Sequence, residues 1–312
     1  MAKSTKTAVQ DPKTLLEAVR YFSDKEVAFD FFRRYRWPNG EPACPHCGCL
    51  ENSFLTTRRI WKCKGCKQQF SIKVGTIFED SPLGLDKWLP AMWLIANAKN
   101  SVSSHELARS LGVTQKTAWF MLHRIRLALE TAETANFSGT VEVDETYVGE
   151  DAKNMHKHLR ARKIHGRGMA HKTAVQGARE RSTGAVVAAV LPKGRNLKAN
   201  VHEWVEPGST VYTDQAWAYL GLGQTFTHES VTHGREYVRG DVHTNGIENF
   251  WALLKRSLKG TQVHVDPRHL DRYVTERAFA YNNRFTNDLG RMTVAARGAH
   301  GRRVTWNELI AK

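Results

Sequence analysis

The chain has 312 residues, enough for two or three domains, and 41% of them are hydrophobic, which excludes a globally disordered protein. No apolar run reaches the ~18–20 residues of a membrane-spanning helix, and MAKSTKTAVQDPKT lacks the apolar core of a secretory signal, so we expect a cytoplasmic protein without membrane partners. The 46 Lys and Arg against 31 Asp and Glu give a net charge of +15, which favours a polyanionic partner, usually nucleic acid, over a merely soluble basic protein.

The first forty residues predict a helical segment. Residues 1–14 are polar and are expected to fray at the terminus. The stretch SDKE, from Ser23 to Glu26, matches a capping box and predicts a short helix through VAFDFFRRYRW. PNGEP then breaks the chain, so we place a boundary at residue 40.

Residues 41–82 predict a zinc ribbon. CPHCGC and WKCKGC each contain a C-x2-C pair, and residues 48–62 separate the pairs. Two thiolate pairs on tight turns bind one Zn²⁺ tetrahedrally, and four thiolates leave no open position, so the ion would be structural. The alternative is a set of reduced structural cysteines. The alternating QQFSIKVGTIF predicts a strand that closes the ribbon. The expected ligands are Cys44, Cys47, Cys63 and Cys66, with Cys49 as the spare or as a competitor of Cys47.

Residues 83–132 predict three helices, the last two in a helix-turn-helix pattern. LDKWLPAMWLIANAKN is amphipathic, and SSHELARSLGVTQKTAWFMLHRIRLALE has capping residues at Ser104 and Thr114 around a turn at Gly112. In such a motif the start of the second helix enters the major groove of DNA. Plain helix packing is the alternative. The expected base-reading residues are Gln115, Lys116 and Thr117.

Beyond a hinge at 130–139, the pattern becomes mixed α/β, and we place a catalytic domain at 138–290 and a C-terminal tail at 291–312. GTVEVDETYVG and STVYTDQAW read as strands, KTAVQGARERSTGAVVAAVLP as a hairpin, and NLKANVHEWV, GIENFWALLKRSLKG and PRHLDRYVTERAFAYNNRF as helices. The predicted fold is therefore multidomain α/β, with a mixed sheet flanked by helices.

Three acidic residues suggest a metal site in this domain. Asp144 lies late in one strand, Asp214 ends another, and Glu248 lies on a helix. Carboxylates at strand ends point into the crevice where α/β sheets bind ligands. Converging carboxylates stay ionised only around a cation, and oxygen ligands select Mg²⁺ or Mn²⁺, so two such ions could drive phosphodiester chemistry. Each acid could instead be a turn or helix cap, and the nearby competitors are Glu142, Glu145, Asp241 and Asn245, of which Asn245 could cap its own helix.

Basic residues near these acids predict contacts with DNA phosphates. The apolar stripe Ile247, Phe250, Trp251 and Leu254 would dock the helix, while Lys255 lies seven residues past Glu248, on the same side, and Arg256 follows it. Residues 153–172 contain seven Lys or Arg, four His and no acid, and predict a clamp on the DNA backbone rather than a solvated face or a metal site. His233 could assist proton transfer or bind a phosphate. The residues expected in the clamp are Arg160, Arg162 and Lys163.

Several motifs resemble those of a known family. VEVDETYVG, VYTDQAWAY and GDVHTNGIENFWALLKRSLKGT are similar to the DDE motifs of bacterial insertion-sequence transposases with an N-terminal zinc ribbon, the group related to eukaryotic Merlin transposases. The resemblance extends to CPHCGC, WKCKGC, FSIKVGTIFEDS and KTAWFMLHRIR, and so covers residues 25–285. It implies an RNase H-like core, with Asp144, Asp214 and Glu248 as the catalytic acids and Lys255 as the basic residue that follows them. Because some relatives carry Asn at the third position, Asn245 stays an alternative to Glu248.

Together these features predict a DNA transposase that binds the terminal inverted repeats of an insertion sequence and catalyses metal-dependent strand cleavage and strand transfer. The expected cofactors are two Mg²⁺ (or Mn²⁺) ions and one structural Zn²⁺. The expected partners are double-stranded DNA, both element ends and target, and further copies of the chain in a homodimer or higher oligomer. The rival hypotheses are a non-catalytic DNA-binding regulator and a Mg²⁺-dependent nuclease or resolvase without strand transfer.

Overall fold

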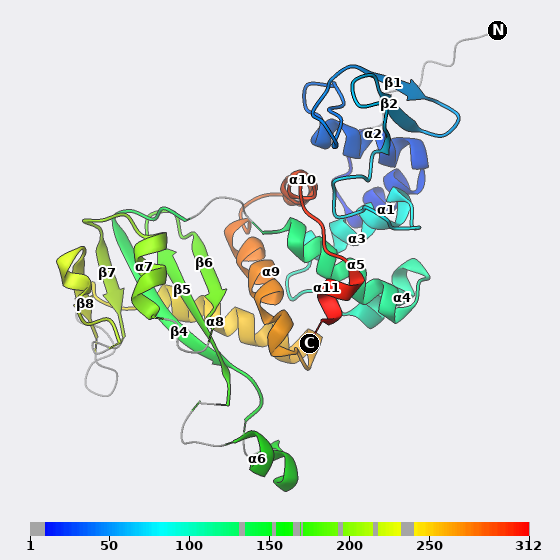
Figure 1. Cartoon of the computed structure of the whole chain (residues 1–312). Coiled ribbons are helices and arrows are strands. Elements are labelled where there is room, and N and C mark those ends of the chain that lie inside the picture. The colour runs from blue at the N-terminus through cyan, green and yellow to red at the C-terminus, as the bar shows by residue number, and fades with distance from the viewer. Residues whose placement is uncertain are drawn as a thin grey trace. The chain divides into compact units, whose positions relative to one another are not determined.

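A computed structural model of the chain describes residues 10–130, 135–151, 154–164, 169, 171–192, 196–214, 218–231 and 240–311. The chain divides into two compact units, the first made of residues 1–131 and 283–312 and the second of residues 132–282 (Figure 1). In the described parts of both units, no helix is long and apolar enough to cross a membrane.

The first unit begins with two helices and a small antiparallel sheet. Asp24, and not the expected capping box at Ser23, begins the second helix, because its carboxylate accepts hydrogen bonds from the backbone N–H groups of Glu26 and Val27. A further helix, capped by Thr14, begins immediately after the segment expected to fray. The third strand is shorter than the alternating pattern predicted. These elements are α1 (Leu15–Ser23), α2 (Lys25–Arg36), β1 (Asn52–Leu55), β2 (Ile60–Cys63) and β3 (Gln69–Ser71).

The helix-turn-helix region is present as expected, although the first of its two caps is Ser103 rather than Ser104. Gly112 ends α4 with a left-handed φ of 62°, which a residue without Cβ adopts freely, and the Thr114 hydroxyl accepts the Thr117 N–H at 3.1 Å to begin α5. The remaining helices of the unit are α3 (Leu85–Asn97), α4 (Ser104–Leu111), α5 (Gln115–Ala128), α10 (Asp288–Gly298) and α11 (Trp306–Ile310).

The C-terminal segment differs from the expected tail. Residues 283–312 join the first unit, and α10 packs against α2, α3 and α5. The boundary predicted at residue 290 therefore falls inside α10. The physical reason is the apolar side of this helix, where Met292, Ala295 and Ala296 are buried.

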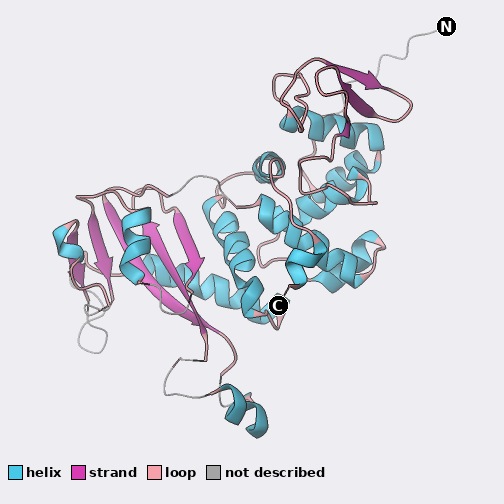
Figure 2. Cartoon of the chain, viewed as in Figure 1, coloured by secondary structure: helices cyan, strands magenta, loops and turns pink. Residues whose placement is uncertain are grey.

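The second unit contains a five-stranded mixed sheet, in the order β6-β5-β4-β7-β8 (Figure 2). Strands β4, β5 and β6 form an antiparallel meander, and β7 and β8 continue the sheet in parallel on the other side of β4. The last strand was not predicted from the sequence. The strands are β4 (Thr140–Val148), β5 (Thr173–Glu180), β6 (Val186–Val190), β7 (Thr210–Thr213) and β8 (Thr227–Ser230).

Helices cover both faces of this sheet, as in an RNase H-like core (Figure 1). One face carries α7 (Leu197–Trp204), and the other carries α8 (Asn245–Ser257), which continues as a π-helical turn, and α9 (Leu270–Asn282). Alternation along β4 sends Val141 and Val143 into the core with α7, and Glu142 and Asp144 toward α8. The short α6 (Lys157–Lys163) lies beyond the ends of β4 and β5.

The buried carboxylate of Glu142 anchors the start of α8. It accepts the Ile247 N–H at 2.9 Å, and Arg181 Nε lies 2.8 Å from its other oxygen, with Arg179 Nη1 at 3.6 Å. A Cβ at Gly246 would lie 2.5 Å from Arg179 Nη1 and 2.6 Å from the same carboxylate, so a side chain here would have to displace these groups. The helix begins after Thr244, with Asn245 as its first residue; the expectation that Asn245 caps the helix is therefore wrong.

We predict that Glu142→Gln lowers the free energy of unfolding by about 2–3 kcal/mol, because the amide leaves two guanidinium groups without their compensating charge in a mostly buried place. Urea unfolding measures this change in free energy, and hydrogen exchange of the β4 and α8 amides shows where the protein is destabilised. The exposed Asp241→Asn is the control and should shift stability by less than about 0.5 kcal/mol. An equal effect of the two substitutions would contradict the anchoring role.

Candidate active site and nucleic-acid interface

The pairing of β4 with β7 brings two of the predicted acids together. The parallel register runs from Thr140 beside Thr210 to Val143 beside Thr213. Asp144 directly follows Val143 in the sequence, and Asp214 directly follows Thr213. Neighbouring strands lie only ~4.8 Å apart, so these side chains meet where the pairing stops. Among the described residues, carboxylate oxygens of Asp144, Glu145 and Asp214 lie within 4.8 Å of one another.

Asp144 is buried and held by two donors. Trp251 Nε1 donates to its Oδ2 at 2.9 Å, and the Glu145 N–H donates to its Oδ1 at 2.8 Å. Burial, together with the neighbouring charges of Asp214 and Glu145, raises the pKa of Asp144 to about 7, although these two hydrogen bonds act to lower it. A divalent cation would relieve the same repulsion, and an all-oxygen donor set suits a hard ion such as Mg²⁺ or Mn²⁺.

Glu145 is the functional candidate that sequence reasoning underrated, since it was only a competitor there. Its Oε2 accepts the Tyr219 hydroxyl at 2.6 Å, and Tyr219 in turn accepts a hydrogen bond from Gln176. Burial raises the pKa of Glu145, the Tyr219 bond lowers it, and Asp214 raises it. Strand alternation directs Glu145 away from Asp144, and only the position of β7 reveals that both carboxylates reach one cluster.

Glu248 is not part of this cluster. It is exposed on the first turn of α8, where its Oε1 accepts the Thr244 hydroxyl at 3.0 Å. It nevertheless lies three residues before Trp251, which touches Asp144, and thus about 4.5 Å along the helix axis from that contact. The structure therefore brings Asp144 and Asp214 together with Glu145 and leaves Glu248 one helical turn from the contact.

The expected basic residue of α8 does lie near the first acid. Partial burial lowers the pKa of Lys255, the charge of Asp144 raises it, and Lys172 and Lys259 lower it. Lys172, the last residue of the segment predicted as a clamp, and Lys259 are therefore neighbours of Lys255. Arg256 is exposed on the same helix.

The predicted backbone clamp is only partly described. Arg160 and Arg162 are exposed on α6, and Lys163 ends this helix. His233 lies outside the described residues. The helix is thus a basic surface element beyond the ends of β4 and β5.

The four predicted cysteines come together in the first unit. Cys44 Sγ lies 3.7 Å from Cys66 Sγ, Cys47 Sγ lies 3.6 Å from Cys63 Sγ, and all four ligand atoms are within 4.8 Å of one another. Four thiolates at this spacing fit a structural Zn²⁺. Cys49 stays outside the set, with its Sγ near the carbonyl of Glu51.

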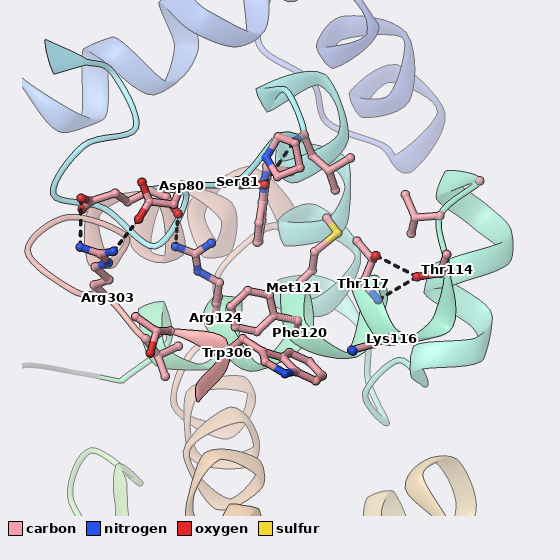
Figure 3. A pocket seen from close by; sticks show the side chains of 18 residues that line it. Asp80, Ser81, Thr114, Lys116, Thr117, Phe120, Met121, Arg124, Arg303 and Trp306 are labelled. Atoms are coloured by element: carbon pink, nitrogen blue, oxygen red, sulfur yellow. Dashed lines mark hydrogen bonds and ion pairs between the residues drawn. The ribbon is translucent and has the colours of Figure 1, made fainter. Parts of the chain in front are cut away.

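The predicted base-reading residues lie at the start of α5, where Lys116 and Thr117 line a cleft of about 850 Å³ (Figure 3). Gln115 and Lys116 are exposed, and Gln115 Nε2 donates to Ser104 Oγ at 2.8 Å, which ties α5 to α4. Lys116 Nζ lies 4.4 Å from the centre of the Trp306 ring, a cation–π contact with α11. Thr117 is half-buried, and its hydroxyl is hydrogen-bonded to Thr114.

A second cleft of the first unit, about 520 Å³ in volume, was not predicted. It lies among α2, the ribbon and the start of α3, and it is lined by several cations and one acid, Asp86. Its cations come from segments far apart in the sequence, so no local pattern could reveal them. They are Lys25, Arg58, Arg59, Lys73 and Lys87.

Fold and site together define an RNase H-like enzyme core with an acidic cluster, joined in one chain to a four-cysteine ribbon. Residues 136–282 match the model of the ISXO2-like transposase domain, and residues 23–69 match the transposase zinc-ribbon domain. An uncharacterized protein in the transposable element ISH50 of Halobacterium salinarum is 30% identical over 254 residues, covering 77% of this chain and 85% of that protein. The chain therefore belongs to the insertion-sequence DDE transposases with an N-terminal zinc ribbon.

One solved structure also aligns with the chain: a simian T-cell lymphotropic virus intasome in complex with the PP2A regulatory subunit B56 gamma. The identity is 12%, with 59% of this chain and 66% of that chain covered. The TM-score of 0.27 is too low to support an argument about this protein.

We predict that the wild-type chain holds about one zinc and that Cys63→Ser loses it, because removal of one of four thiolates weakens the site and metal binding is coupled to folding of the ribbon. Elemental mass spectrometry of the purified chains measures the occupancy. Cys49→Ser is the matched control and should keep its zinc. Full occupancy in Cys63→Ser, or equal loss in both variants, would refute the ligand assignment.

Proposed function

We propose that this transposase binds the terminal inverted repeats of its element and catalyses metal-dependent cleavage and strand transfer of DNA. The observation that carries this proposal is the convergence of Asp144, Glu145 and Asp214 where the β4–β7 pairing ends. Such a group of acids in a chain of net charge +15 fits a site that handles both a metal and a polyanion.

Asp144 and Asp214 would hold Mg²⁺ or Mn²⁺ together with Glu145, Glu248 or both. Two bound ions would supply activation of the attacking oxygen and stabilisation of the leaving oxygen. The chain itself would orient the DNA: Lys255, which lies near Asp144, and its neighbour Lys172 would hold phosphate oxygens beside the acids. Water attacks at the element end, the freed 3′-OH then attacks target DNA, and no covalent enzyme intermediate is needed.

We retain Glu248 as the third catalytic acid, although the acid cluster does not include it. It lies on the same helix as Trp251, and Trp251 already contacts Asp144. A rotamer change of this exposed side chain costs little compared with a movement of α8, whose start is anchored by Glu142. Glu145 would then hold the cluster together, and Glu248 would join it when metal and DNA are bound.

DNA recognition would use the first unit and α6. Gln115 and Lys116, at the exposed start of α5, would reach base edges, and the cation-lined cleft near the ribbon would hold backbone phosphates. Because an element has two ends that must be processed together, we infer a homodimer or higher oligomer on DNA. The reaction would take place in the cytoplasm, where prokaryotic DNA lies.

We predict that Asp144→Asn, Asp214→Asn and Glu248→Gln each abolish cleavage and joining but leave binding to element ends intact. Each replacement keeps the shape of the side chain and removes one charge and one oxygen ligand from a site that demands near-octahedral geometry. A gel assay of labelled end DNA with Mg²⁺ measures cleavage and joining, and a gel shift without Mg²⁺ measures binding. Asp241→Asn, an exposed acid outside the described cluster, is the control.

Two further variants decide the third ligand. If Glu145→Gln is inactive and Glu248→Gln cuts normally, Glu145 is the third acid. If Asn245→Ala is inactive and Glu248→Gln is not, the third position is Asn245. Normal cutting by all acid variants would refute the assigned acids, absence of cutting by the wild type would favour the regulator hypothesis, and cutting without joining by the wild type would favour the nuclease.

We predict that neutralising Arg160, Arg162 and Lys163 on α6 weakens binding to every DNA alike. Phosphate contacts release counterions, so each lost contact should flatten the slope of log K against log salt by ~0.9. Titrations of specific and unrelated duplexes at several salt concentrations measure this slope. Gln115→Ala is the contrasting variant, because loss at a base-reading position should change preference among sequences. A sequence-dependent loss in the α6 variant would overturn its assignment as a clamp.

A further inference from the structure

Trp251 stands out in the second unit because it combines a packing role with a direct contact to the acid cluster. It is 4% exposed and belongs to the apolar core between the sheet and helices α8 and α9. Its indole N–H does not point to solvent but donates to Asp144 Oδ2 at 2.9 Å. No packing requirement alone would place this donor on the carboxylate.

Gly177 on β5 provides the space for the indole. It is the register partner of Asp144, so both residues lie under the same stretch of α8. A Cβ at position 177 would lie 2.7 Å from Trp251 Cη2 and 3.0 Å from Cζ2, closer than real carbon atoms approach. The strand therefore has a slot, opposite the first acid, that fits this ring.

From these contacts we propose that Trp251 is a positioning residue of the active site, seated in the Gly177 slot, which holds the Asp144 carboxylate and sets the position of α8 relative to the acid cluster. The inference rests on the proposed function. Oδ1 of Asp144 accepts the Glu145 N–H and Oδ2 accepts the indole, so the plane of the carboxylate is defined by two donors. The same ring determines where Glu248, three residues before it, and Lys255, four residues after it, lie along the acids.

The decisive experiment removes the donor and keeps the shape. Benzothienylalanine at position 251 replaces the indole N–H by sulfur, and Trp251→Phe is the simpler variant. We expect kcat for end cleavage to fall roughly ten-fold or more, the value for one hydrogen bond to a charged group, while KM for DNA stays unchanged. Affinity for Mn²⁺ alone, measured by calorimetry on the zinc-loaded chain, should fall several-fold, and the melting temperature of the benzothienylalanine protein should match the wild type.

Two comparisons separate positioning from packing. Trp204→Phe removes the same bulk at a comparably buried site in the other core of this unit, and it should leave kcat and Mn²⁺ affinity at wild-type values. Gly177→Ala should reduce kcat in the wild-type background but cost little more when Trp251 is Phe, since the smaller ring leaves space for the methyl group. Independent effects of these two substitutions would count against the slot.

The inference is overturned if benzothienylalanine at 251 gives wild-type kcat and Mn²⁺ affinity, or if Trp204→Phe loses as much of both as Trp251→Phe. Asp144→Asn, assayed in parallel, distinguishes this failure from that of the proposed function. An inactive Asp144→Asn beside a fully active benzothienylalanine protein refutes only the positioning role. An active Asp144→Asn refutes the metal site on which the inference rests.

Discussion

The point where β4 and β7 stop pairing is the constraint on which the candidate site depends. Parallel strands keep residues of equal register side by side, and the last pair, Val143 with Thr213, directly precedes the two aspartates. The carboxylates are thus forced together by backbone hydrogen bonds and not by any attraction between them. Burial and mutual repulsion raise the pKa of Asp144 to about 7 as a consequence. The sheet stores an electrostatic cost that a divalent cation would relieve.

The other functional groups depend on how α8 is placed against this strand pair. Glu142 and Asp144 lie two residues apart on the same face of β4, and both contact the helix, the first through the Ile247 N–H and the second through Trp251. Two contacts one helical turn apart fix both the position and the rotation of the helix. The apolar residues between them add burial without deciding the register. A single strand therefore supplies both the first acid and the support for the helix that carries Glu248 and Lys255.

Much of this arrangement could be predicted from the sequence where a pattern is local. The spacing of the cysteine pairs predicted the ribbon cluster, and the ends of two strands predicted that Asp144 and Asp214 meet. The role of Glu145 could not be predicted, because alternation along a strand places neighbours on opposite faces and only the β7 register shows that both reach one cluster. The C-terminal helices could not be predicted for a related reason. Helix α10 packs against α2, α3 and α5, which lie more than 150 residues earlier in the chain.

Charged side chains are arranged differently in the two units. In the second unit, Lys255 lies near Asp144 of the acidic cluster and has Lys172 and Lys259 as neighbours, so attraction for metal and attraction for phosphate would act at adjacent places. In the first unit, cations gather around a cleft that contains a single acid, Asp86. Binding of DNA backbone there needs no metal, whereas a phosphate at the acids is repelled until a cation arrives. Under the proposed function, recognition of an element end would therefore precede the assembly of the reacting site, and the chemistry would wait for the ion that makes the acids compatible with the substrate.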